Sequence, residues 1–314
     1  MRVELTAAVF ATDDHAREVV LLLHHFSEER HQWAVGPLLV EAVESFLDRH
    51  VPELAPGYKS LARQAALQHA AYRTPADPTP VVVSPEDIKE HVADLTRPAV
   101  VMVEDDATDG GFITAIAQVF KAGDILTAIE KDWLVIDHGG GSGGVFRRAA
   151  DKRDRFRRLP RVAVVLDSDR LLPDAPSQHD AKVATLRAKE VKVHLLRLRE
   201  IENYVPDKCL LKLDCQQQDQ TRADALARLS KAQRGHYDMK KGFKNNKVPA
   251  QQKSLFRGLS AELCKDLTSG FGPKMISCLL DHADILTEED FRTDVGPDVP
   301  DELRAMLAMI REII

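Results

Sequence analysis

From Pro98 onward the chain alternates short β-branched apolar runs with helical stretches. The apolar runs lie at 98–104, 132–139, 161–169 and 191–198, and the helical stretches between them at 111–122, 146–161 and 179–190. Near-continuous apolar strands that alternate with helices are typical of a parallel sheet with helices on both faces. The sequence therefore predicts an α/β fold with a parallel sheet over residues 96–206.

Helical spacing of apolar residues dominates on both sides of this unit. Before it, such spacing occurs at Asp14–Ser27, Val35–Asp48, Gly57–Tyr72 and Pro85–Leu95, with possible strands at Val3–Ala11 and Val81–Ser84. The Pro-rich segment 74–80 breaks any helix that would cross it. We expect a mainly helical N-terminal module (1–95), the α/β unit (96–206), and a helical C-terminal region (207–314) with a Lys-rich loop at 239–253.

Composition indicates a soluble globular protein. The chain has 314 residues, 44% of them apolar, and a formal charge of -6, which suits about two packed domains. No run approaches the roughly 20 apolar residues of a membrane span, and acids interrupt the N-terminal segment where a signal peptide is apolar. We therefore expect a cytoplasmic protein without membrane contact. Because no CxxC pair occurs, we expect buried free thiols at Cys209, Cys215, Cys264 and Cys278.

Acidic residues follow the predicted strands. Glu104, Asp105, Asp106 and Asp109 come after the first, Asp137 ends the second, and Asp167 and Asp169 end the third. Ligands of an open parallel sheet bind outside the carboxyl ends of its strands, and carboxylates suit Mg²⁺ or Mn²⁺. Residues i and i+2 can point to one side, so Asp167 and Asp169 are expected to face one metal while Ser168 points away. Helix capping is the alternative role of such acids.

The strand ends also resemble a known family. Val103–Glu104, the glycines 139–141, the DSD run Asp167–Asp169 and the segment 199–206 (REIENYVP) together resemble the TOPRIM domain over residues 98–206. The similarity is to the version in OLD-type nucleases and related stand-alone bacterial defence proteins. This resemblance implies a TOPRIM-like Rossmannoid parallel sheet and a role in antiviral defence.

The resemblance also implies roles for individual residues. Glu104 would be the catalytic, metal-linked glutamate, Asp167 and Asp169 would bind Mg²⁺, and Glu202 matches the glutamate of the family's ENY segment. Glu200 or Glu202 is a further candidate ligand, although a first-turn helix acid is an equal alternative for Glu202. The family has Gly directly after its glutamate and Asp four residues on, whereas this chain has Asp105 and then Asp109 at five. Asp105 or Asp106 is therefore an alternative to Asp109 as metal ligand.

Metal-bound carboxylates at this edge suit phosphodiester cleavage, since cations polarise the phosphate and lower the pKa of a bound water. Such a site also needs a nearby lysine to contact the phosphate. The candidates are Lys240 and Lys241, with a solvated loop as the alternative reading.

Two basic segments can carry a phosphate backbone to this site despite the acidic net charge. We expect one long helix over 146–161 with Arg147, Arg148, Lys152, Arg153, Arg155, Arg157, Arg158 and Arg161, and a second cluster that includes Lys244 and Lys247. The glycine-rich turn 139–144 offers backbone N–H groups to a phosphate. Solvated surface faces are the alternative interpretation of both segments.

Three functions stay open from the sequence. A metal-dependent nuclease acting on DNA or RNA is favoured. A receiver-like signalling domain would use Asp105 and Asp106 as its acidic pair and Asp167 as phosphoacceptor, but the interval between them is long and no matching lysine follows. A non-catalytic nucleic-acid-binding TOPRIM module is the third. OLD-type nucleases carry an ATPase on the same chain, whereas no GxxxxGK[ST] motif occurs here. The resemblance therefore implies an ATPase partner in trans, and the helical flanks are available for partner or homodimer contacts.

Overall fold

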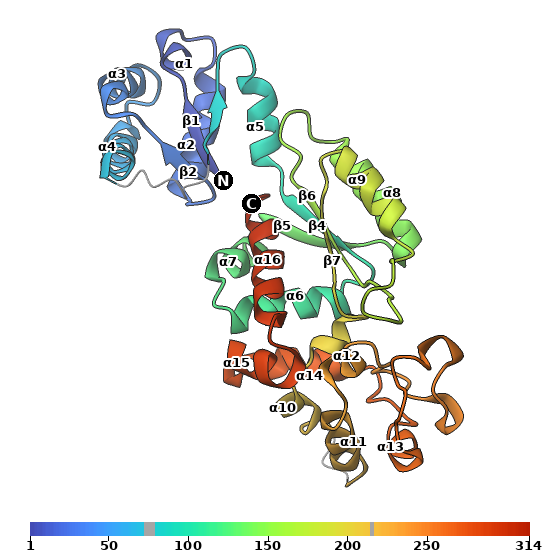
Figure 1. Cartoon of the computed structure of the whole chain (residues 1–314). Coiled ribbons are helices and arrows are strands. Elements are labelled where there is room, and N and C mark those ends of the chain that lie inside the picture. The colour runs from blue at the N-terminus through green and yellow to red at the C-terminus, as the bar shows by residue number, and fades with distance from the viewer. Residues whose placement is uncertain (72–78, 214–216) are drawn as a thin grey trace.

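The computed structural model describes residues 1–71, 79–213 and 217–314, and Figure 1 shows their arrangement. It contains a three-stranded parallel sheet of order β2-β1-β3 and a four-stranded parallel sheet of order β5-β4-β6-β7. Helices flank both sheets (Figure 1). The predicted α/β fold with parallel strands is therefore confirmed.

The N-terminal module is built on the three-stranded sheet. Its strands are β1 (Arg2–Leu5), β2 (Gln32–Ala34) and β3 (Val81–Val83), and its helices are α1 (Ala7–Ala11), α2 (Ala16–Ser27), α3 (Val40–His50), α4 (Ala55–Ala71) and α5 (Ile88–Thr96). Strand β2 was not predicted, because three residues are too few for a periodic pattern to emerge. Helix α3 begins five residues later than expected, after a 3₁₀ turn that Pro37 opens. Tyr72, the expected last residue of the third helix, lies outside the described residues.

The four-stranded sheet, here called the central sheet, contains all the strands predicted after Pro98. They are β4 (Ala99–Val103), β5 (Leu134–His138), β6 (Val162–Leu166) and β7 (Lys192–Leu195). Successive side chains of a strand point to opposite faces of its sheet. Val101 and Val103 accordingly join one buried apolar cluster, and Val100 and Met102 join another. Burial on both faces explains why the strand sequences are apolar throughout rather than alternating.

Helices cover the two faces unequally (Figure 1). One face carries α8 (Ser142–Arg153) and α9 (Asp180–Ala188), and the other carries α6 (Thr108–Val119), α7 (Gly123–Glu130) and the C-terminal helix α16 (Val299–Arg311). Leu303 and Leu307 of α16 lie in the same apolar cluster as Val101 of β4. The end of the chain thus completes the core of the central sheet.

The remaining C-terminal elements are short. They are the 3₁₀ turn η2 (Ile201–Tyr204) and helices α10 (Asp207–Leu210), α11 (Gln217–Ala227), α12 (Lys231–Arg234), α13 (Ala261–Asp266), α14 (Met275–Asp281) and α15 (Glu288–Asp290). Cys209, Cys264 and Cys278 are buried free thiols, as expected, and Cys215 lies outside the described residues. No helix in the described part of the chain is long and apolar enough to cross a bilayer.

The prediction of a single basic helix over 146–161 is wrong for its second half. Helix α8 ends at Arg153, and the chain then turns toward the N-terminal module. The carboxylate of Asp94 accepts hydrogen bonds from the backbone N–H groups of Arg157, Arg158 and Leu159. These hydrogen bonds satisfy the backbone N–H groups of residues 157–159 in the absence of a helix. Pro160 could not continue a helix in any case.

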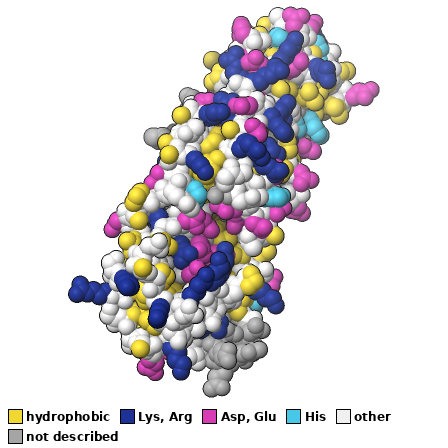
Figure 2. Space-filling view, turned by 90° about the vertical axis from the view of Figure 1, so that its right-hand side faces the viewer, with side chains coloured by type: hydrophobic (Ala, Val, Ile, Leu, Met, Phe, Trp, Pro, Cys, Tyr) yellow, Lys and Arg dark blue, Asp and Glu magenta, His cyan; other side chains and the backbone are white. Residues whose placement is uncertain are grey.

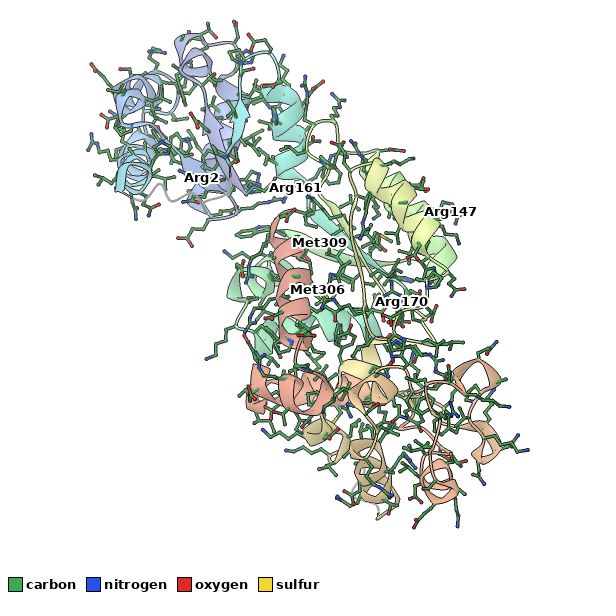
Figure 3. The ribbon with its side chains drawn as sticks, in the orientation of Figure 1. Arg2, Arg147, Arg161, Arg170, Met306 and Met309 are labelled. Carbon is green, nitrogen blue, oxygen red and sulfur yellow. The ribbon has the colours of Figure 1, made fainter. Side chains whose placement is uncertain are left out.

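Arg161 is also not on the basic surface where the sequence placed it. Its side chain is 1% exposed, and Figure 3 shows it where the N-terminal module, the central sheet and the end of α16 meet. The guanidinium donates hydrogen bonds to the carbonyl oxygens of Asp94, Leu95, Arg97 and Ile313. Arg161 therefore joins three parts of the fold instead of facing solvent.

Candidate functional site at the carboxyl edge of the central sheet

The strand order of the central sheet sends the segments that follow two neighbouring strands to opposite faces. From β4 the chain passes through α6 and α7 on one face, and from β6 it passes to α9 on the opposite face. Because β4 and β6 are neighbours, their following loops separate, which is the arrangement of a ligand site in open α/β sheets. Glu104 directly follows β4 and Asp167 directly follows β6.

Asp109 shapes the loop that carries Glu104. One of its carboxylate oxygens, Oδ2, accepts hydrogen bonds from the backbone N–H groups of Glu104 (2.9 Å) and Asp105 (3.0 Å). Asp105 instead accepts from the backbone N–H and hydroxyl of Thr108 at the start of α6. Asp106 is exposed. Of Asp105, Asp106 and Asp109, it is therefore Asp109 whose carboxylate binds the backbone of Glu104.

Asp167 is partly buried and lies among like charges. Its Oδ1 accepts a hydrogen bond from the backbone N–H of Ile201 (2.9 Å) at the start of η2. Burial raises the pKa of the Asp167 carboxyl well above its usual value, and repulsion from Glu202, Asp109 and Glu200 raises it further. A shift of this kind is typical of functional carboxylate clusters.

Glu104, at the end of the neighbouring strand β4, has a similar environment. Burial raises the pKa of its carboxyl, and repulsion from Asp169 and Asp109 adds to the rise. Burial also raises the pKa of Asp109, although two backbone hydrogen bonds oppose that change. The edge of the sheet therefore holds more negative charge than neighbouring cations balance.

Asp169 is held by the segment before α9. Its Oδ2 accepts a hydrogen bond from Nε2 of Gln178 (2.8 Å) and lies 3.3 Å from Nε2 of His179. His179 is buried and packs against Phe146 of α8. The hydroxyl of Ser168 donates a hydrogen bond to the carbonyl oxygen of Leu198. Sequence reasoning missed His179, because no spacing along the chain relates it to Asp169.

Of the two candidate lysines, Lys240 reaches the carboxylates. Its Nζ lies 3.0 Å from Oε1 of Glu202. Glu202 is 2% exposed, and its other oxygen, Oε2, has no hydrogen-bond partner among the described residues. The side chain of Lys241 is exposed, and its backbone N–H binds Asp238. Lys241 thus belongs to the turn rather than to the carboxylate cluster.

Arg199 is a second cation at the site that the sequence reasoning did not select. Its Nε lies 3.1 Å from Oε1 of Glu200, and one of its terminal nitrogens lies 3.1 Å from Oδ2 of Asp238. Burial raises the pKa of Glu200 even with Arg199 beside it. Arg199 therefore pairs with Glu200 and Asp238, whereas Glu202 pairs with Lys240.

Most basic residues of the 147–158 segment are paired with acids from elsewhere in the fold. Arg148 and Lys152 lie beside Asp137, Arg153 binds Glu190, and Arg158 binds Glu90. Arg147 is exposed on α8 (Figure 3), and within the described residues its side chain forms no ion pair. The segment thus offers fewer free cations than its sequence suggests. Lys244 and Lys247 are exposed on the Lys-rich loop (239–253) of the C-terminal region.

Charge on the surface is nevertheless segregated. Figure 2 shows acidic side chains gathered at mid-height of the molecule, with Lys and Arg side chains beside them. Exposed cations close to an acidic, metal-suited centre can hold a phosphate backbone through salt-sensitive contacts. The arrangement is compatible with a polyanionic ligand despite the net charge of -6.

The glycine-rich turn packs against the first turn of α8. Its N–H groups at Gly139 and Gly141 bind the carbonyl oxygens of Val103 and Glu104, so these donors are already engaged rather than free for a phosphate. A Cβ atom at Gly144 would overlap the carbonyl oxygen of Gly139. The turn therefore positions the loop that carries Glu104.

We expect Gly144→Ala to lower the free energy of unfolding by about 1–3 kcal/mol, the usual cost of overpacking. Gly143→Ala is the matched control, because a Cβ there meets nothing within 4 Å. Urea denaturation of both variants checks the prediction. Equal stability of the two would contradict the close packing of the turn.

The donor set fits a hard divalent cation. No group of three or more His, Cys, Asp or Glu side chains in the described residues is arranged to hold a metal ion as the side chains stand. The chemistry is nevertheless suitable, since carboxylate oxygens are the ligands that Mg²⁺ prefers. Buried oxygens of Glu200 and Glu202 lack any partner in the described structure, and a buried polar atom without a partner is costly. A cation would satisfy these atoms and offset the repulsion around Asp167.

We expect Asp167→Asn to stabilise the metal-free protein at neutral pH, by on the order of 1 kcal/mol or more. Its amide oxygen can still accept from Ile201, while the repelled charge is gone. Because the folded-state pKa of Asp167 is raised, the wild type loses stability as the pH rises from the unfolded value of about 4 through the folded one. The advantage of the variant should therefore vanish as the pH falls to about 4. Thermal unfolding with EDTA checks this, and a destabilised variant at pH 7 would contradict it.

Comparison with known proteins gives no relative for this chain. It matches no protein-family model, and no curated protein or solved structure is significantly similar to it. The residues at the carboxyl edge of the central sheet are therefore the basis for assigning a function.

Proposed function

We propose that this protein is a nuclease that uses Mg²⁺ or Mn²⁺ to cleave phosphodiester bonds of DNA or RNA, through a TOPRIM-like central sheet. The observation that carries the proposal is that Glu104 and Asp167 directly follow the neighbouring parallel strands β4 and β6, so that both lie at the carboxyl edge of the central sheet. Burial raises the pKa of both, and repulsion from Asp109 adds to the rise at each. A metal-dependent centre needs such a concentration of oxygen ligands.

Each residue has a role that follows from its position. Asp167, Asp169, Glu202 and Asp109 would hold the cations together with Glu104. The metal ions, when bound, would polarise the scissile phosphate and lower the pKa of a water molecule. Glu104, whose pKa is raised by burial, would accept or donate a proton in the reaction. Lys240 would offer its ammonium group to a phosphate oxygen.

The nucleic acid would be held by exposed cations near this edge. Arg147 on α8 and Lys244 and Lys247 on the C-terminal loop are exposed and would contact the phosphate backbone. Arg148, Lys152, Arg153, Arg157 and Arg158 would contribute general positive potential, although most of their side chains have acidic partners. Such contacts weaken as salt increases.

The proposed setting is cytoplasmic antiviral defence, with activity controlled by a separate ATPase. Exposed apolar side chains of the N-terminal module supply surface for that partner or for a second copy of the chain; they are Leu21, Leu38, Leu54, Leu67 and Val82. Copurification of a fully active, unregulated monomer would contradict this part of the proposal.

A cleavage assay tests the proposed function. The purified protein is incubated with plasmid, single-stranded DNA and tRNA, in Mg²⁺ or Mn²⁺ and in EDTA. Cleavage that requires the metal supports the proposal and identifies the substrate. Binding to these nucleic acids without any cleavage would favour a non-catalytic module, and transfer of phosphate to Asp167 from a small phosphodonor would favour a receiver.

A further inference from the structure

Lys240 forms an ion pair with one of the proposed metal ligands. Its Nζ lies 3.0 Å from Oε1 of Glu202, whose side chain is almost fully buried. The second oxygen of Glu202 has no partner in the described residues. A buried carboxylate with one oxygen unsatisfied has capacity for a further cation ligand.

Other acids also act on this ammonium group. Burial alone lowers the pKa of Lys240, but attraction to Glu202, Glu200 and Asp167 outweighs burial and raises it. Lys240 in turn partly offsets the repulsion at Asp167 and Glu104. A single ammonium charge therefore lies among the carboxylates proposed to bind a doubly charged ion.

The backbone of Lys240 is fixed, whereas its side chain is partly exposed. Phe271 donates a backbone hydrogen bond to the carbonyl oxygen of Met239 (2.7 Å), and Gly270 packs so closely on Lys240 that a Cβ atom would overlap its backbone. The side chain is 41% exposed. A long lysine side chain on a fixed backbone can leave one partner for another without refolding the loop.

We infer that in the metal-free protein the Lys240 ammonium occupies the cation position beside Glu202, so that a divalent ion must displace it to bind. This inference rests on the proposed metal site. The two cations compete because both need the same carboxylates and repel each other at short range. Displaced from Glu202, the ammonium group would be available to a phosphate oxygen of the substrate, so that metal binding would release it for that contact.

Mn²⁺ affinity in the absence of nucleic acid tests the inference. Isothermal titration calorimetry compares the wild type with Lys240→Met, which keeps the length of the side chain and removes its charge. We expect about tenfold tighter binding, the equivalent of one charge-assisted hydrogen bond that no longer has to be broken. Lys241→Met, the neighbouring exposed lysine, is the matched control and should bind as the wild type does. Unchanged or weaker binding by Lys240→Met would overturn the inference.

Three further variants separate the possible failures. Lys240→Gln also removes the charge and should bind Mn²⁺ more tightly than the wild type, which tests the inference if the Met variant does not fold, whereas Lys240→Arg keeps the charge and should show no such gain. Asp167→Asn should abolish binding at the site. If it does so while Lys240→Met leaves the affinity unchanged, the inference alone is wrong. If the wild type binds no Mn²⁺, or Asp167→Asn binds it normally, the proposed function fails together with the inference.

Discussion

Replacing Glu104 with Gln is expected to lower metal-dependent cleavage at least about a hundredfold, the usual contribution of a general acid or base. Gln has the same shape as Glu but cannot transfer a proton at this position, and it brings no charge to a cation. The loop should remain intact, because Asp109 holds it through the backbone N–H groups of residues 104 and 105. Single-turnover cleavage of the preferred substrate measures the effect.

Asp106→Asn is the control for this experiment. Asp106 lies two residues further along the same loop, is exposed, and loses a charge of the same sign. We expect its cleavage rate to stay within about twofold of the wild type, since exposed charges interact weakly with a buried site. If Glu104→Gln cleaves as fast as Asp106→Asn, Glu104 is not part of the centre.

Replacing Arg161 with Met should lower the free energy of unfolding by about 3 kcal/mol or more. The variant removes the hydrogen bonds that Arg161 donates to the carbonyl oxygens of Asp94, Leu95, Arg97 and Ile313. Buried carbonyl groups without donors cost more than the bonds themselves contribute. Met fills much of the same volume, so the loss measures polar satisfaction rather than a cavity.

Arg155→Met is the matched control, since Arg155 is an exposed arginine of the same segment. Its substitution should change stability by less than about 0.5 kcal/mol. Urea denaturation, followed by far-UV circular dichroism, compares the two. A similar small change in both variants would show that the junction around Arg161 does not depend on its guanidinium.

Much of the central sheet could be predicted from local pattern. Strands β4 and β6 are apolar and buried on both faces, whereas β5 and β7 contain polar residues as well. The alternation of all four strands with helices favours a parallel sheet. The positions of Glu104 and Asp167 at the strand ends follow from the same pattern. The small N-terminal sheet was harder to predict, because its strands have only three or four residues and its helices have the stronger periodicity.

The charges show where local reasoning ends. In sequence, residues 147–161 are a run of Arg and Lys with few acids nearby. In the fold, Asp137, Glu190 and Glu90 come from three other elements to pair with them, and Arg161 is buried. His179 meets Asp169, and Lys240 meets Glu202, across distances along the chain that no motif spacing encodes.

The sequence by itself determined most of the secondary-structure elements. The period of apolar residues, the positions of glycine and proline, and the acids at strand ends are local features, so each can be recognised within one segment. Only the tertiary structure decided which charges face each other. Coulomb interaction and desolvation depend on distance in space and on burial, and both arise when β4 and β6 become neighbours and the C-terminal loop brings Lys240 to Glu202. The net charge of the chain therefore says little about this edge, where burial raises the pKa of Glu104, Asp109, Asp167 and Glu200.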